Sequence, residues 1–141
     1  MSQRKVVVTG LGIVCPIGSS VNQAWEAAVA GRNGISKITA FDASQMPVQI
    51  SGAVADFNAD DYITPKEQKK MDVFSHYGIG AAVQAINDAG LEINESNAER
   101  AGVAIGSGIG GLPYIEANHQ KYLDGGARKI SPFFVPASII N

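Results

Sequence analysis

Short apolar runs beside glycine-rich turns mark two places where the chain predicts buried strands. Residues 4–9 read Arg-Lys-Val-Val-Val-Thr, and residues 101–105 read Ala-Gly-Val-Ala-Ile. Apolar runs of this kind, without polar alternation, are typical of parallel strands covered on both faces. A shorter strand with alternating character is expected within 48–54. Together with the helices described next, these runs predict an α/β fold.

Helical periodicity predicts three helices, over residues 21–30, 72–89 and 113–123. The middle one has a broad stripe of apolar and small residues, and small side chains allow close packing against another layer. Ser19 or Ser20 can cap the N-terminus of the first helix, and glycine follows each helix, as expected at helix ends. The glycines expected in this role are Gly31, Gly90, Gly125 and Gly126.

Composition and charge narrow the class of protein. The 141 residues suffice for a domain with a core, and 45% are hydrophobic while only 17% are charged. The formal net charge of −2 gives no global basic signal for nucleic acid. The single cysteine excludes an internal disulfide framework and fits a reducing cytoplasm. The chain stays apolar over its last residues, 131–141, so we expect the sequence to be cut off.

The glycine cluster at residues 106–111 matches the spacing G-x-G-x-x-G, and Asp124 follows 18 residues after Gly106. This pattern allows a nucleotide-binding hypothesis. However, Pro113 follows directly and no second strand is evident, so a glycine turn that shapes an apolar site is favoured. The first glycine turn, residues 10–18, lacks the third fingerprint glycine and indicates a tight strand-to-helix connection.

A local basic cluster stands out on this acidic chain. Thr64 and Pro65 form a suitable N-cap and first helical residue. Lys66, Lys69 and Lys70 follow at spacings that place them on one helical face. From spacing alone, a solvated helix face and a docking surface for an acidic partner are equally supported.

The remaining reactive side chains indicate structural roles. Cys15 has no nearby His, Lys or Arg on its C-terminal side to activate it as a nucleophile. His76 and His119 are lone histidines within predicted helices. The aspartates of 56–61 lack the tight alternation of a metal loop, so no metal site is expected.

Taken in order, the motifs resemble the N-terminal part of the bacterial β-ketoacyl-acyl-carrier-protein synthases of type II, within the thiolase-like superfamily. The resemblance covers essentially the whole chain. The matching stretches are Val6–Gly12, Pro16–Gly18, Trp25, Gly34–Ser36, Phe41–Asp42, Asp56–Asn58, Lys66–Gln68, Lys70–Asp72, Ala104–Leu112, Glu116, Asn118–His119 and Arg128–Pro136.

The resemblance implies a thiolase-like fold with α-β-α-β-α layers, of which residues 1–141 would be the incomplete N-terminal half. It implies a homodimeric acyltransferase that elongates acyl chains by decarboxylative condensation with malonyl-acyl carrier protein. The family's catalytic Cys, two His and Lys lie beyond Asn141, so no catalytic residue and no cofactor are expected here, and the isolated chain should be inactive.

The resemblance also assigns binding roles to residues of this chain. Lys66, Lys69 and Lys70 match the basic helix that meets acyl carrier protein, which favours docking over a merely solvated face. Ile109 matches a residue that gates the acyl pocket, and Phe134 matches an aromatic that closes the pocket of the neighbouring subunit.

Three hypotheses therefore stand. The first is the N-terminal part of a condensing enzyme. The second is a separate docking module for acyl carrier protein without catalysis, and the third, weaker one is a nucleotide-binding α/β domain. If the sheet is incomplete, the chain should also expose apolar surface and tend to associate.

Overall fold

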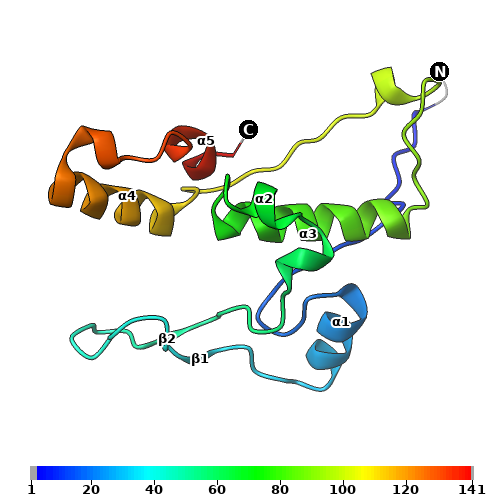
Figure 1. The fold of residues 1–141 in the computed structure, drawn as a ribbon. Helices are drawn as coiled ribbons and strands as arrows, with labels where there is room; N and C mark the ends of the chain where they lie inside the picture. The colour runs from blue at the N-terminus through cyan, green and yellow to red at the C-terminus, as the bar shows by residue number, and fades with distance from the viewer. Residues whose placement is uncertain (1–2, 141) are drawn as a thin grey trace. The chain divides into compact units, whose positions relative to one another are not determined.

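The computed structural model describes residues 3–140, and their regular secondary structure is almost entirely helical, with long coil segments between the helices (Figure 1). The α-helices are α1 (Val21–Val29), α2 (Pro65–Gln68), α3 (Val73–Asp88), α4 (Leu112–Gly125) and α5 (Phe134–Ser138). Short 3-10 turns are η1 (Ala59–Asp61), η2 (Ala98–Arg100) and η3 (Ala127–Lys129). Strands β1 (Ser36–Lys37) and β2 (Ile50–Ser51) pair antiparallel, with Ser36 opposite Ser51 and Lys37 opposite Ile50.

The three predicted helices are confirmed as α1, α3 and α4, with ends within two residues of the expected ones. The hydroxyl of Ser20 accepts a hydrogen bond from the Gln23 N–H at 3.3 Å and caps α1. Gly31, Gly90 and Gly126 follow their helices with φ of 63°, 57° and 75°. Those angles lie in the left-handed region that glycine adopts without strain, which explains why the helices end there.

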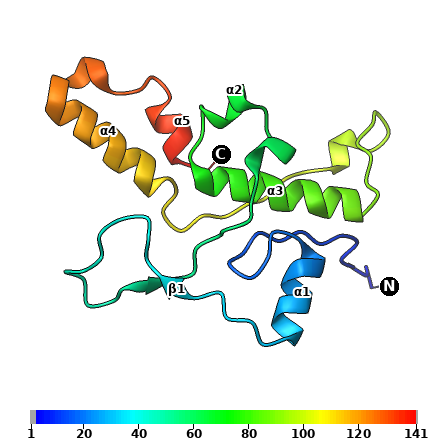
Figure 2. The ribbon, with the colours of Figure 1, turned by 60° about the horizontal axis from the view of Figure 1, so that its bottom comes forward.

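The predicted strands at 4–9 and 101–105 are wrong for the described structure. Both segments run as coil, as Figures 1 and 2 show at the blue and yellow parts of the chain. A strand needs a neighbour to pair its backbone groups, and the described residues contain only the two-residue ladder of β1 and β2. Of the strand expected within 48–54, only Ile50–Ser51 pairs, and it pairs antiparallel. The parallel sheet of the expected α/β fold is therefore not formed among residues 3–140.

Unpaired apolar segments leave much apolar surface open. Val6 is 90% exposed and Val103 is 84% exposed. Within residues 3–140, few apolar side chains are buried, and all but one of them are alanines: Ala24, Ala27, Ala43, Ile63 and Ala137. The prediction of exposed apolar surface is thus confirmed. No helix in the described part of the chain is long and apolar enough to cross a membrane.

The chain divides into two compact units, and α3 contributes residues to both. The first unit extends to Phe57 and includes Gly80–Glu92. In it, the glycine turn packs directly on α3: a Cβ added at Gly12 would clash with the Ala81 carbonyl and lie 2.9 Å from the Ala85 nitrogen. The small-residue stripe of α3 therefore receives a glycine-containing coil.

The second unit, Asn58–Ile79 with Ile93–Asn141, is organised around a buried amide. Asn118 is 2% exposed, and its Nδ2 donates to the Tyr114 carbonyl at 2.8 Å. Its Oδ1 accepts from the Ser131 N–H at 2.9 Å, and the Ser131 hydroxyl accepts from the Tyr114 hydroxyl at 2.8 Å. These bonds join α4 to the segment that leads into α5, and both helices lie together in Figure 1.

Candidate functional site

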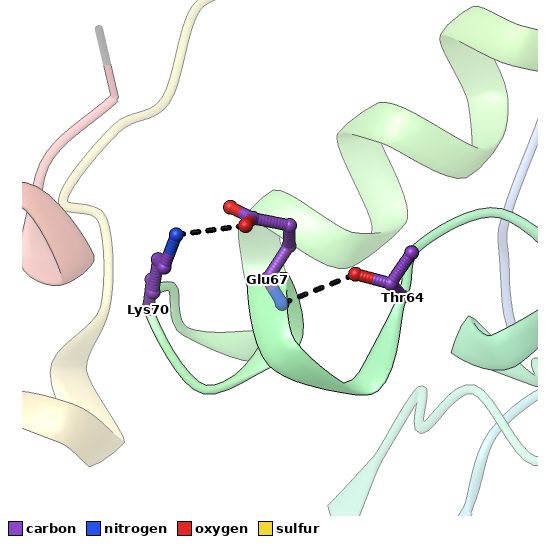
Figure 3. A network of polar contacts seen from close by, with 3 residues as sticks. All are labelled: Thr64, Glu67 and Lys70. Atoms are coloured by element: carbon purple, nitrogen blue, oxygen red, sulfur yellow. Dashed lines mark hydrogen bonds and ion pairs between the residues drawn. The ribbon is translucent and has the colours of Figure 1, made fainter.

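The basic cluster lies on a tight, capped turn of the second unit, which we call the lysine turn (residues 64–70). Its sequence predicts the local structure: the Thr64 hydroxyl accepts from the Glu67 N–H at 3.4 Å, and Pro65 is the first residue of α2 (Figure 3). Helix α2 ends at Gln68, and the next residue is its C-cap. The chain continues as a turn, with Lys70 N–H donating to the Glu67 carbonyl at 2.9 Å.

The three lysines of the turn differ in their surroundings. Lys66 and Lys69 are exposed, and neither makes an ion pair within residues 3–140. Lys70 is half-buried, and its Nζ lies 2.7 Å from Glu67 Oε1. Figure 3 shows the Glu67 carboxylate turned toward Lys70. The turn therefore presents two open cations and one cation that is already paired.

Gln68 fixes the lysine turn to the rest of its unit. Its Nε2 donates to Asp60 Oδ1 at 2.7 Å and to the Ile63 carbonyl at 2.8 Å. Its carbonyl oxygen lies 3.2 Å from Nε2 of His76, which is half-buried on α3. His76 thus contacts the backbone of the lysine turn from α3. Contacts on both sides hold the lysines on a defined surface rather than on a free loop.

An apolar cavity of about 300 Å³ opens beside Lys70. Its lining combines the lysine turn, α3, the coil after η2 and the end of α5. The lining residues are Lys70, Met71, Ser75, Gly78, Ile79, Ile105, Pro136, Ile139 and Ile140. One cation at the edge of an apolar cavity suits a ligand or partner segment with an acidic group next to an apolar one.

The two predicted acyl-pocket residues occupy different places. Ile109 lies on the glycine coil, 71% exposed, and lines none of the described cavities. Phe134 begins α5 and lines a cavity of about 380 Å³. That cavity is otherwise lined by Ile115, Asn118, His119, Tyr122 and Ile130. The structure thus does not bring Ile109 and Phe134 into one cavity, and their acyl-pocket roles stay predictions.

The glycine cluster does not form an open phosphate cradle. The Gly111 N–H donates to the Ser138 carbonyl at 2.9 Å, and the Gly110 N–H donates to the Ser107 hydroxyl at 3.1 Å. At the start of α4, the Tyr114 N–H donates to the carboxylate of Asp72 at 3.0 Å. A phosphate needs free N–H groups at a helix N-terminus, and here a carboxylate of the protein already takes that position.

Two further side chains, those of Cys15 and Asp42, make local contacts. Cys15 pairs its backbone with Gly18 in both directions, and its Sγ lies 3.4 Å from the Gly18 carbonyl. Hydrogen bonds from the backbone and side chain of Ser44 lower the pKa of Asp42. Within residues 3–140, no group of three or more His, Cys, Asp or Glu side chains is arranged to hold a metal ion.

Sequence reasoning missed two residues that shape this unit. Glu67 pairs with Lys70, and the spacing Thr64-x-x-Glu67 is the capping-box signature that could have drawn attention to it. Asp72 accepts a hydrogen bond from the Tyr114 N–H, 42 residues away in the sequence, and no local sequence pattern predicts such a contact.

Comparison with known proteins gives consistent matches along the whole chain. The family described as beta-ketoacyl synthase, N-terminal domain, matches residues 3–141. A protein of Vibrio cholerae named 3-oxoacyl-[acyl-carrier-protein] synthase 2 is 50% identical over 141 residues, and one of Coxiella burnetii with the same name is 52% identical. Each comparison covers 100% of this chain and 34% of the relative, so the chain spans about a third of their length.

Solved structures show a similar fold. The ishigamide ketosynthase/chain length factor superposes with a TM-score of 0.80 at 26% identity, over 98% of this chain and 34% of the other. A type II polyketide synthase acyl-carrier protein in complex with its ketosynthase gives 0.75 at 25% identity, over 94% of this chain and 34% of the other.

Proposed function

This chain belongs to the β-ketoacyl synthase family, whose N-terminal domain matches residues 3–141, and we propose that it forms the N-terminal third of a 3-oxoacyl-[acyl-carrier-protein] synthase 2. The observation that carries the proposal is the identity of 49–52% to proteins of that name over 99–100% of the chain. The complete protein would act in fatty acid elongation, in the cytoplasm.

The proposed reaction is a decarboxylative condensation. An acyl group moves from the thiol of its carrier to an enzyme thiolate, which releases the carrier thiol. Malonyl-acyl carrier protein loses CO₂, and the resulting carbanion attacks the enzyme-bound thioester. The new C–C bond forms as the enzyme thiolate leaves, and the product is a 3-oxoacyl chain two carbons longer. The nucleophile and its partners would lie outside residues 1–141, so the isolated chain should not catalyse this step.

Within that enzyme, we assign docking of the acyl carrier protein to the lysine turn. Lys66 and Lys69 are exposed cations on a turn that Gln68 holds in place. An acidic partner is attracted to such a cluster, and the attraction raises the rate of encounter more than the final affinity. A ketosynthase of similar fold has been solved in complex with its acyl-carrier protein, which supports this class of partner.

The remaining assignments concern the acyl chain and the assembly. Ile109 would gate an acyl pocket, and Phe134 would close the pocket of the neighbouring subunit in a homodimer. The exposed apolar segments that contain Val6 and Val103 would then be covered as the α-β-α-β-α layers are completed. The similarity in fold to solved ketosynthases supports this arrangement.

The test uses the protein expressed from its complete coding sequence. Its intact mass should be roughly three times the 14.7 kDa of this chain, because the chain spans 34% of its relatives. Incubated with an acyl-loaded carrier and malonyl-acyl carrier protein, it should yield the 3-oxoacyl product and CO₂. The 141-residue chain, assayed alongside, should yield neither.

A complete gene product near 14.7 kDa that binds carrier protein without condensation would contradict the enzyme and favour the docking module. A protein of the longer mass that forms no 3-oxoacyl product would contradict the proposed activity. The nucleotide-binding alternative gains no support, because protein groups occupy the N-terminal donors of α4.

A further inference from the structure

Glu67 holds a position within the lysine turn that a partner's carboxylate would need. Its Oε1 lies 2.7 Å from Lys70 Nζ, and the two side chains are 46% and 37% exposed. Figure 3 shows both side chains on the same side of the turn. A carboxylate from a docking partner therefore reaches Lys70 only by sharing or displacing Glu67.

The turn also contains a second donor for the Glu67 carboxylate. Thr64 and Glu67 have the spacing of a capping box, in which each side chain bonds the other residue's backbone N–H. Only half of the box is formed: the Thr64 hydroxyl accepts from the Glu67 N–H at 3.4 Å. The Thr64 N–H makes no hydrogen bond within residues 3–140, and Thr64 is exposed.

We propose that Glu67 is an internal competitor for the acidic partner, paired with Lys70 in the free protein and transferred to the Thr64 N–H when a partner carboxylate takes Lys70. This inference rests on the proposed docking role of the lysine turn. The exchange conserves charge pairing: one carboxylate replaces another on Lys70, and the displaced carboxylate completes the capping box. Because the pair is part-exposed, the displacement costs little and the turn keeps its backbone.

Such an exchange has a functional consequence for a carrier that must leave after each step. The competitor weakens the complex by the free energy of one exposed ion pair, which corresponds to about two- to fivefold in Kd. It also discriminates among partners, because only an anionic group placed at Lys70 can displace Glu67. A partner that contacts only Lys66 and Lys69 gains nothing from the exchange.

The decisive experiment is a double-mutant cycle in the protein expressed from its complete coding sequence, with its acyl carrier protein as the probe. Glu67→Gln frees Lys70 and should tighten binding about two- to fivefold at low salt. Lys70→Met should weaken binding, and in that background Glu67→Gln should change Kd by less than about 1.5-fold, because no lysine remains to be freed. The Glu67→Gln substitution keeps a side-chain oxygen that can cap the turn, so folding should be preserved.

Asp61→Asn is the matched control for loss of one negative charge nearby. Its carboxylate accepts from Asn58 Nδ2 at 3.0 Å rather than from a lysine. We expect only a small change in Kd, equal with or without Lys70. If Asp61→Asn tightens binding as much as Glu67→Gln, or if the Glu67→Gln gain persists in Lys70→Met, then Glu67 acts through long-range charge alone and the competition is overturned.

Exchange of the Thr64 amide hydrogen gives an independent readout. Saturating carrier protein should slow this exchange in the unchanged protein, and Glu67→Ala should remove the slowing. Unchanged Thr64 exchange on binding would overturn the transfer of the carboxylate. A failure of the docking proposal itself would give a different result, because the combined substitutions Lys66→Glu and Lys69→Glu would then leave Kd unchanged. If only the competition by Glu67 fails, those two substitutions still weaken binding.

Discussion

Asp72 and Tyr114 are joined by a hydrogen bond across 42 residues of sequence: the Tyr114 N–H donates to Asp72 Oδ2 at 3.0 Å. The other carboxylate oxygen of Asp72 accepts from the Val73 N–H at 2.7 Å. Val73 is the first residue of α3, and Tyr114 lies in the first turn of α4. One carboxylate thus satisfies donors at two helix N-termini, where negative charge is favoured by both helix dipoles.

We predict that Asp72→Asn lowers the free energy of unfolding by about 1–2 kcal/mol. The asparagine amide has only one acceptor oxygen and carries no negative charge, so it cannot satisfy both helix N-termini as the carboxylate does. Urea unfolding of the protein from the complete coding sequence measures this. Asp56→Asn is the control, since Asp56 is exposed and makes no hydrogen bond to a helix N-terminus within residues 3–140. Equal midpoints for the two variants would contradict the double cap.

A second prediction concerns the close approach of the first glycine turn to α3. A Cβ at Gly12 would clash with the Ala81 carbonyl. The atoms nearest to the added methyl group are backbone atoms of Ala81 and Ala85, which cannot move aside as a flexible side chain can. Gly12→Ala should therefore destabilise the protein by about 1–3 kcal/mol.

Gly78 on the same helix α3 provides the opposite case. A Cβ there would meet no atom within 4 Å, so Gly78→Ala should stabilise the protein by about 0.5–1 kcal/mol through helix propensity. Thermal or urea unfolding of the two variants should shift in opposite directions. Stabilisation by both substitutions would show that the turn moves away from α3 at little cost, whereas destabilisation by both would contradict the open space at Gly78.

These glycines and caps also show how far the sequence predicts the structure. The ends of α1 and α3 depend on local groups such as Ser20, Gly31 and Gly90. Both glycines were predicted, and the cap of α1 was predicted to be Ser19 or Ser20. The valine run at Val6 has a strong local preference for a strand but finds no strand to pair with among the described residues. Helices close their own hydrogen bonds, whereas strands depend on distant segments, so the first were predictable and the second were not.

In the candidate site, too, one feature was predictable from the sequence and another was not. The cap of the lysine turn follows from Thr64 and Pro65, which are adjacent to the lysines they position. The pairing of Lys70 with Glu67 was not predicted, because spacing alone allows Glu67 to bond either Lys70 or the Thr64 N–H. The side chain's choice between two nearby partners depends on geometry that residue types do not encode.

A third prediction tests the lysine turn as a docking surface. Lys69→Glu combined with Lys70→Glu should weaken binding of acyl carrier protein by about tenfold or more at low ionic strength, because attraction becomes repulsion. The difference from the unchanged protein should shrink as salt rises and screens the charges. Titrations at several salt concentrations measure it.

Lys121→Glu is the matched control, since Lys121 is an exposed lysine of α4 outside the lysine turn. It makes a charge change of the same sign as each turn substitution and should alter Kd by less than about twofold. If Lys121→Glu weakens binding as much as a single substitution in the turn, net charge rather than the turn's geometry attracts the carrier.

The last prediction concerns chain-length selection by Ile109. This side chain is 71% exposed within a coil of glycines, and a Cβ at neighbouring Gly108 would meet no atom within 4 Å. A larger side chain is therefore accommodated without a folding penalty from the described residues.

If Ile109 gates an acyl pocket in the complete enzyme, Ile109→Phe should reduce kcat/KM for long acyl chains by about tenfold or more while short chains lose about twofold or less. Ile109→Val is the conservative control, which should leave the ratio of the two kcat/KM values within about twofold. Equal losses for long and short chains in Ile109→Phe would mean that the residue supports the loop and does not select by length.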